Sequence, residues 1–154
     1  PSRTPWVERP TGGKAVLHGH DVTVSIAVPV EGRPDLHAIY RAWTAPILDA
    51  CEALGLAMTL GENPTDAEGE DCFAETGRFD FVDRNGVKRA GCAMRVSRGA
   101  ALLQASFPFR TPEVDADRLI VGGRPSPSIT EWRSKGMGGA LEDALRSRGH
   151  GVGR

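Results

Sequence analysis

The chain has 154 residues, enough for one domain with its own hydrophobic core. Hydrophobic residues make up 40% and charged residues 25% of the chain, and the formal net charge is −1. This composition lacks the basic excess of nucleic-acid-binding proteins, and the sequence has no apolar run of membrane-spanning length and no secretory signal. We therefore expect a cytoplasmic protein whose partners are neither nucleic acid nor membrane.

The first half of the chain predicts one strand and one long helix. Residues 1–14 are polar and contain several prolines and glycines, which is typical of a loop. Val22–Val28 alternates apolar and polar residues, as a half-buried strand does. Between Asp35 and Leu54, apolar residues recur at three- and four-residue steps. Pro34 before this segment and Gly55 after it are typical of the two ends of a helix.

A β-hairpin and a further strand follow. The acidic, turn-rich residues 61–70 are typical of a surface loop. Phe79–Val82 and Val87–Val96 flank Asn85-Gly86, and Asn-Gly is a strong hairpin signal. Ala101–Phe107 has the composition of another strand.

The pattern weakens towards the C-terminus. A short amphipathic helix is predicted over about Ile129–Leu145, and Ser147–Arg154 is expected to fray. Hairpins dominate this order, and no regular alternation of strand and helix is present. The sequence therefore predicts an α+β fold, with helices packed on a mixed, mainly antiparallel sheet in a single domain over residues 1–154.

Three cysteines form an odd count without framework spacing, which favours free thiols in a reducing compartment. Cys51 falls on the apolar face of the predicted helix and Cys92 among small strand residues, so we expect both to pack in the core. Cys72, after the acidic loop, has two interpretations. It is either a buried structural cysteine or a nucleophile whose thiolate a nearby cation or base favours.

The run from Arg9 to His18 has the sequence Arg-Pro-Thr-Gly-Gly-Lys-Ala-Val-Leu-His. Glycines let backbone N–H groups approach a ligand closely, and an arginine beside them can hold an anion. The run lacks the full phosphate-loop pattern, so an ordinary turn explains its glycine pair equally well.

Lys88 stands out within the predicted strand Val87–Val96. Strict alternation places it on the more apolar face with Ala90 and Cys92, opposite Gly91. A lysine there is costly unless an anion meets it. The alternative is that the side chain extends along the surface to water.

The residues His18-Gly19-His20-Asp21 could begin a zinc site, because two histidines and an aspartate lie within four positions. Such a site needs further ligands, and the other two histidines are His37 on the predicted helix and His150 near the C-terminus. We therefore predict no metal site.

Three blocks of the sequence together resemble the lipoate–protein ligase and octanoyltransferase family, part of the larger biotin/lipoate ligase fold. The run Arg9 to His18 is similar to the family's Arg-Arg-x-Ser/Thr-Gly-Gly-x-Ala-Val-x-His block, and Asp21 and Thr23 continue it. Cys72-Phe73 is placed as in the family's cysteine-nucleophile branch. Gly86 to Ala93 is similar to the Gly-x-Lys-x-x-Gly-x-Ala block.

The resemblance implies transfer of an octanoyl or lipoyl group to one lysine of a lipoyl carrier domain, such as the glycine cleavage H protein or a dehydrogenase E2 subunit. In the transferase branch, a cysteine takes the acyl group from octanoyl-acyl carrier protein as a thioester, without a cofactor. In the ligase branch, ATP and Mg²⁺ activate free lipoate or octanoate as an acyl-adenylate.

The resemblance also implies roles for particular residues. Cys72 would be the nucleophile, and Lys88 would stabilise developing negative charge and favour the thiolate. The residues implied for substrate binding are Arg9, Thr11, Gly12, Gly13, Ala15, Val16, His18, Gly91 and Ala93.

Several positions depart from the family pattern. Glu8 replaces the first arginine, and Gln104 is followed by Ala105-Ser106 instead of His-Gly. Lys14 occupies the third position of the glycine triplet usual in ATP-using ligases, which favours the transferase branch. The family carries a sizeable segment before the arginine block, so we expect a catalytic domain lacking its N-terminal segment. An acyltransferase with Cys72 as nucleophile is the leading expectation. An ATP-dependent lipoate ligase and an inactive ligase-like binding module are the alternatives.

Overall fold

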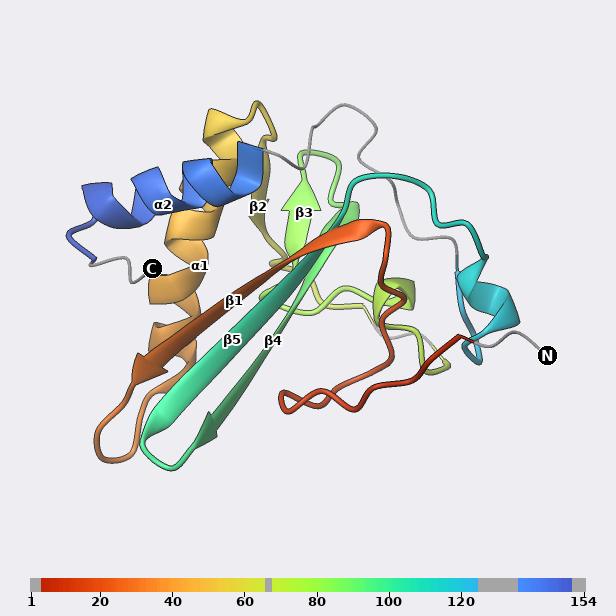
Figure 1. Cartoon of the computed structure of the whole chain (residues 1–154), viewed down its shortest axis with the longest axis horizontal. Helices are drawn as coiled ribbons and strands as arrows, with labels where there is room; N and C mark the ends of the chain where they lie inside the picture. Colours follow the sequence, from red (N-terminus) through yellow and green to blue (C-terminus); the bar gives the residue numbers. More distant parts are fainter. Residues whose placement is uncertain (1–3, 66–67, 125–135, 151–154) are drawn as a thin grey trace.

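The computed structural model describes residues 4–65, 68–124 and 136–150. Its strands form one antiparallel sheet in the order β1-β5-β4-β3-β2, beside two α-helices (Figure 1). This arrangement confirms the predicted α+β class, with a sheet that is antiparallel throughout. The strands are β1 (Asp21–Pro29), β2 (Met58–Leu60), β3 (Phe81–Asp83), β4 (Lys88–Ser97) and β5 (Ala100–Pro108).

The long helix α1 (Leu36–Ala53) lies where the sequence predicts it. The Asp35 side chain caps it by accepting hydrogen bonds from the backbone N–H groups of His37 and Ala38. Gly55, with φ of +77°, follows the last turn, where an L side chain would be strained.

The hydrophobic core lies between α1, α2 (Met137–Ser147) and one face of the sheet (Figure 1). The alternation predicted for β1 places Val24 in this core and leaves Thr23 exposed. The buried members of the core are Val24, Ile47, Ala50, Cys51, Phe81, Ala90, Leu103, Ala105, Phe107, Met137 and Ala144.

The predicted hairpin is present, but strict alternation in β4 was a wrong prediction. Phe81 pairs with Ala90 while Val82 pairs with Lys88, so β4 bulges by one residue. The extra residue, Arg89, forms an ion pair of 2.8 Å with Asp83. As a result, Lys88 and Gly91 approach each other instead of lying on opposite faces, and a Cβ built on Gly91 would be 3.6 Å from Lys88 Cε.

Three other elements differ from the sequence predictions. The short strand β2 and the 3₁₀ helices η1 (Cys72–Ala74) and η2 (Ala116–Arg118) were not predicted. The first part of the predicted C-terminal helix lies outside the described residues, and α2 continues beyond its predicted end. Residues 148–150 are not frayed, because Arg148 pairs with Asp49 at 2.6 Å and His150 packs on Trp43.

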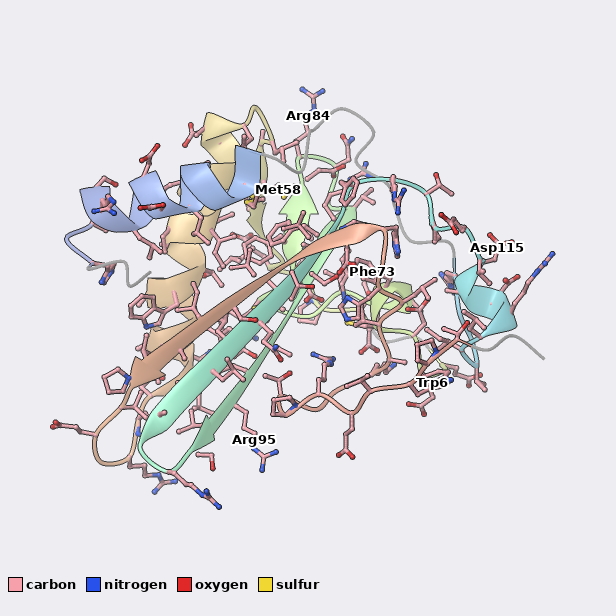
Figure 2. The ribbon with its side chains drawn as sticks, in the orientation of Figure 1. Trp6, Met58, Phe73, Arg84, Arg95 and Asp115 are labelled. Atoms are coloured by element: carbon pink, nitrogen blue, oxygen red, sulfur yellow. The ribbon has the colours of Figure 1, made fainter. Side chains whose placement is uncertain are left out.

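The loop before β1 crosses the side of the sheet away from α1 (Figure 1). Arg95 on β4 lies between strand and loop and donates a hydrogen bond to the carbonyl of Pro10 at 2.9 Å (Figure 2). Within the described ranges, no helix is long and apolar enough to cross a membrane.

Candidate active site

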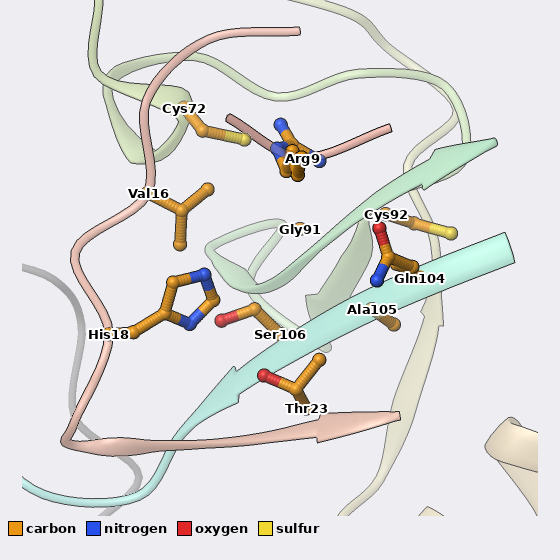
Figure 3. Close-up of a pocket in the computed structure, with 10 residues that line it drawn as sticks. All are labelled: Arg9, Val16, His18, Thr23, Cys72, Gly91, Cys92, Gln104, Ala105 and Ser106. Atoms are coloured by element: carbon orange, nitrogen blue, oxygen red, sulfur yellow. The ribbon is translucent and has the colours of Figure 1, made fainter. Parts of the chain in front are cut away.

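A pocket of about 90 Å³ opens where the loop before β1, the segment of η1 and strands β4 and β5 meet (Figure 3). Residues from all three sequence blocks meet in this pocket, Cys72 among them. Its lining residues are Arg9, Val16, His18, Thr23, Cys72, Gly91, Cys92, Gln104, Ala105 and Ser106.

Backbone hydrogen bonds fix the position of Cys72. Its N–H donates to the carbonyl of Ala15 at 2.9 Å, and the N–H of Ala15 donates to the carbonyl of Glu70 at 2.7 Å. The buried carboxylate of Asp71 caps η1 by accepting from the N–H of Phe73 at 2.9 Å, and it also accepts from the N–H of Arg124. The cysteine is therefore held by the glycine-containing loop on one side and by residues after η2 on the other.

Lys88 meets an anion in the protein interior, so the extended, solvated alternative was wrong. Its Nζ lies 2.7 Å from Asp80 Oδ2, and both side chains are almost completely buried. The same Nζ donates to the backbone carbonyls of Cys72 and Glu75 and lies 3.5 Å from Cys72 Sγ. It also lies 5.2 Å from the centre of the Phe73 ring, whose place in η1 is labelled in Figure 2.

Asp80 is itself held by the backbone. Its carboxylate accepts from the N–H of Gly77 at 2.6 Å and from the N–H of Cys92 at 2.9 Å. A buried carboxylate with these donors and a lysine partner has its hydrogen-bonding capacity satisfied, so the ion pair holds the ammonium in one place.

The expected activation of Cys72 by Lys88 is outweighed by burial. Burial raises the pKa of the Cys72 thiol, the positive charge of Lys88 lowers it, and the negative charge of Asp80 raises it again. The net effect is a pKa above the ordinary thiol value. Lys88 therefore acts in the predicted direction, but its effect on the thiol is smaller than that of burial.

The predicted substrate-binding residues divide into two groups. Arg9, Val16, His18 and Gly91 line the pocket. The remaining predicted residues do not line it: Thr11, Gly12, Gly13, Ala15 and Ala93. Three of them make contacts elsewhere in the structure. Thr11 donates to Gln104 Oε1 at 3.0 Å, a Cβ built on Gly13 would meet the Arg9 guanidinium, and Ala15 pairs with Asp71.

Two features favour glycine at position 13. Its φ of +86° suits only glycine without strain, and a Cβ there would lie 3.0 Å from Arg9 Nη2. The same guanidinium group donates to the carbonyl of Lys14 at 2.9 Å. Lys14 Nζ in turn lies 2.7 Å from Glu75 Oε2, so the residue in place of a third glycine joins the loop to the segment after η1.

His18, which lines the same pocket, is paired with Asp21. His18 Nδ1 lies 2.7 Å from Asp21 Oδ2, and Asp21 also accepts from Ser106 Oγ at 2.6 Å and from the N–H of Gly19. The hydrogen bond with Asp21 raises the pKa of His18, against the effect of burial. Burial would raise the pKa of Asp21, but the bonds from His18 and Ser106 outweigh it and lower that pKa to about 2.

His20 does not line this pocket. It is 2% exposed, and neither of its ring nitrogens has a hydrogen-bond partner among the described residues. Burial lowers its pKa. No three His, Cys, Asp or Glu side chains in the described ranges are grouped so that they could hold a metal ion.

Sequence reasoning missed several residues of the site. Asp80, Asp71, Ser106 and Gln104 were not predicted, and Asp21 was noted only as a continuation of a motif. Asp80 had one usable signal, because it is a carboxylate between two phenylalanines in a predicted strand. The other three act through contacts between segments far apart in the chain, which a single sequence does not specify.

Comparison with known proteins assigns the chain to a family. Residues 2–129 match the family model of the lipoyl protein ligase A/B catalytic domain. The octanoyltransferase LipM of Bacillus cereus is 32% identical over 126 residues. That match covers 74% of this chain and 44% of LipM, so the chain spans less than half the length of this relative.

Solved structures agree on the fold. Protein Ta0514 of T. acidophilum, described as a lipoate protein ligase and solved with bound lipoic acid, superposes with a TM-score of 0.71 at 20% identity. That match covers 95% of this chain and 59% of Ta0514. A lipoate-protein ligase A bound with ATP gives a TM-score of 0.59 at 17% identity, over 83% of this chain and 51% of that protein. By its sequence match and its fold, the chain belongs to the lipoyl protein ligase A/B catalytic domain family.

Proposed function

We propose that this chain carries the site of an acyltransferase that moves an octanoyl or lipoyl group to a lysine of a lipoyl carrier domain. Cys72 is the nucleophile and holds the acyl group as a thioester between the two halves of the reaction. The observation that carries the proposal is the contact of 3.5 Å between Cys72 Sγ and the buried Lys88 ammonium, inside a pocket lined by the Arg9–His18 loop.

The positive charges near Sγ have a role in both transfers. Each attack on a thioester carbonyl builds negative charge on the carbonyl oxygen, which fixed cations stabilise without reorganising. Lys88 is fixed by Asp80, and the Arg9 guanidinium lines the same pocket. Gly91 has no side chain, so the acyl group can approach β4, where a Cβ would lie 3.2 Å from Cys72 Sγ.

The donor and acceptor follow from the family. The donor is octanoyl-acyl carrier protein, and the acceptor is a lysine of the glycine cleavage H protein or of a dehydrogenase E2 subunit. The free thiols Cys51, Cys72 and Cys92 support a reducing, cytoplasmic setting. This reaction needs no cofactor, because the donor thioester is already activated.

Mass spectrometry of the intact protein tests the proposal. After incubation with octanoyl-acyl carrier protein, we expect one octanoyl group on Cys72, and discharge of that group when a lipoyl carrier domain is added. Cys72→Ala should form no adduct and transfer nothing. Cys51→Ala is the matched control, because Cys51 is buried in the core away from the pocket.

The fold shared with an ATP-bound lipoate-protein ligase A gives the alternative function. An ATP-dependent ligase of free lipoate or octanoate would modify the carrier domain only with ATP and Mg²⁺, and it would keep that activity in Cys72→Ala. Absence of turnover with either donor would instead support an inactive binding module. Either result would contradict the thioester proposal.

A further inference from the structure

A second cavity, of about 210 Å³, borders the pocket that contains Cys72. His18 lines both cavities, so they adjoin at this residue, whose side chain is 51% exposed. No step of the acyl transfer described above uses the second cavity. Its position beside the nucleophile pocket makes it a candidate site for the part of a substrate that does not react.

The end of the β1–β5 pair builds this cavity. The antiparallel pairing continues for one backbone bond beyond the strands, from the N–H of Phe109 to the carbonyl of His20 at 2.9 Å. One residue further along, Arg110 Nη2 donates to the carbonyl of Gly19 at 2.8 Å. The guanidinium carbon of Arg110 also lies 5.7 Å from the centre of the Phe109 ring. These contacts hold the cation of Arg110 at the cavity.

Arg110 keeps hydrogen-bond donors for a ligand. A guanidinium group has five N–H donors. Within the described residues, Arg110 makes no other hydrogen bond than the one to Gly19, and it forms no ion pair with a carboxylate. Its side chain is exposed. The planar fork of donors matches two oxygens of a phosphate or carboxylate group.

His20 is a second polar group at the cavity. It is 2% exposed, and neither ring nitrogen has a hydrogen-bond partner among the described residues. Burial lowers its pKa, and the positive charge of Arg110 lowers it further, so the ring is neutral at neutral pH. Unmade hydrogen bonds of a buried imidazole are costly, and amide groups can both donate to such a ring and accept from it.

The remaining walls restrict the kind of ligand. One carboxylate, Glu113, lines the cavity and opposes an anion. The aliphatic part of the lining consists of Leu17, Pro112, Val114 and Leu119. A fitting ligand therefore has an aliphatic portion, amide groups and one anionic group near Arg110. It also reaches the Cys72 pocket past His18.

The acyl-carrier donor has a part with this chemistry. It presents its acyl group on a phosphopantetheine arm, a chain with amide groups and a branched aliphatic unit that ends in a phosphodiester. We propose that the second cavity binds this arm, with the phosphate on Arg110 and the thioester end directed past His18 to Cys72. The inference rests on the proposed function, because an acyl-carrier donor is what brings such an arm to the site.

Two small donors that differ by one phosphate test this assignment. Octanoyl-phosphopantetheine carries the whole arm, and octanoyl-pantetheine lacks its phosphate. Mass spectrometry of the full chain gives the rate constant of Cys72 acylation by each. The wild type should prefer the phosphorylated donor by about tenfold, the low end for a charged hydrogen bond, because Arg110 is exposed. Added salt should reduce the preference.

Variants of Arg110 separate phosphate binding from a structural role. Arg110→Ala should reduce the preference to about one, because the loss falls on the phosphorylated donor. A structural role would slow both donors alike and leave the preference unchanged. Arg110→Lys should keep part of it, since an ammonium keeps the charge and lacks the fork. Arg118→Ala is the matched control, because it removes an exposed arginine of η2 that does not line the cavity.

The opposing carboxylate provides a test in the other direction. Glu113→Gln removes a negative charge from the cavity. It should increase the preference for the phosphorylated donor by up to about fivefold, the upper range for exposed charges. Glu113 is exposed, so this variant should fold as the wild type does.

The possible failures are distinguishable. No octanoyl group on Cys72 from octanoyl-acyl carrier protein itself would overturn the proposed function and this assignment together. Acylation by the carrier protein, with no preference between the small donors or no reaction with either, would overturn the assignment and leave the thioester intact. A preference that survives in Arg110→Ala would do the same. Inhibition by adenosine monophosphate that Arg110→Ala relieves would assign the cavity to a nucleotide instead.

Discussion

The two faces of the sheet carry different kinds of side chain. On the face against α1 and α2, Val24 of β1 and Leu103 of β5 pack among apolar neighbours. On the opposite face, Thr23 and Gln104, one position away along the same strands, line the pocket. Alternation along each strand thus separates a face that supplies non-directional hydrophobic stability from one that orders polar groups for chemistry.

The polar face is held by buried charges and backbone hydrogen bonds. Two of its carboxylates, Asp71 and Asp80, are at most 5% exposed. Each accepts one backbone N–H group from a residue close in sequence and one from a more distant segment. Such networks position groups accurately, but each lost partner leaves an unsatisfied polar atom. We therefore expect mutations on the polar face to change the reactivity of the site as well as the stability, and mutations on the core face to change the stability alone.

Removing the lysine of the buried pair should have the largest effect. We expect Lys88→Met to lower the free energy of unfolding by about 3–5 kcal/mol, because Asp80 stays buried without a partner. The variant should also slow alkylation of Cys72 by iodoacetamide, since the charge of Lys88 lowers the pKa of that thiol. Denaturant unfolding and the alkylation rate are the measurements.

Lys14→Met is the matched control, because the Lys14–Glu75 ion pair has the same length but is about a quarter exposed on each side. Its loss should cost at most about 1 kcal/mol. Equal losses for the two variants would contradict the view that burial makes the Lys88 pair special.

Shortening a side chain on the core face should lower the free energy of unfolding nearly as much as Lys88→Met does, without changing the reactivity of Cys72. Leu103→Ala leaves a cavity beneath the sheet and should lower the free energy of unfolding by roughly 2–5 kcal/mol. The alkylation rate of Cys72 in the folded protein should not change. Leu102→Ala, half-buried on the other face, should cost less. A Leu103→Ala variant with altered Cys72 reactivity would show that the faces are coupled.

The smallest of these effects is the acid sensitivity that Asp21 confers. Its pKa falls from 3.8 to about 2, and each unit is worth about 1.4 kcal/mol, so the carboxylate contributes about 2 kcal/mol. Because the folded pKa is the lower one, this stability is present above pH 4 and is lost as the pH falls towards 2. Unfolding measurements from pH 2 to pH 7 should show a decline that Asp21→Asn removes.

Asp49→Asn is the comparison variant, because Asp49 also pairs with a cation, Arg148, but at the surface. We expect it to leave the decline in place, since water screens an exposed pair. If both variants lost the decline to a similar extent, the acid sensitivity would belong to carboxylates in general and not to Asp21.

Local patterns were sufficient for most of the fold. The alternation around Val24 predicted β1 and its buried face, and Asn85-Gly86 predicted the hairpin. Asp35 and Gly55 bracket α1 because capping and helix termination depend on neighbouring residues alone. The short strand β2 was missed because three residues are too few to show a period.

The site was only partly predictable, for physical reasons that differ among residues. The motif blocks located Cys72, Lys88, Arg9 and His18, and the structure brings these residues to one place. The bulge beside Lys88 was not predictable, because it depends on the register between β3 and β4. The raised pKa of Cys72 was missed for a similar reason, since burial is a property of the whole fold.

The hydrogen bonds between Ala15 and the Glu70–Cys72 segment use backbone atoms on both sides. Every residue except proline carries both of these backbone groups, so side chains at position 15 can change without releasing the cysteine. Over evolution, the side chains of the Arg9–His18 loop can therefore change while the distance between this loop and Cys72 stays the same. Relatives with a different residue at this position can preserve the same attachment, and proline is the one substitution that removes a bond from it, the one that the N–H of residue 15 donates to Glu70.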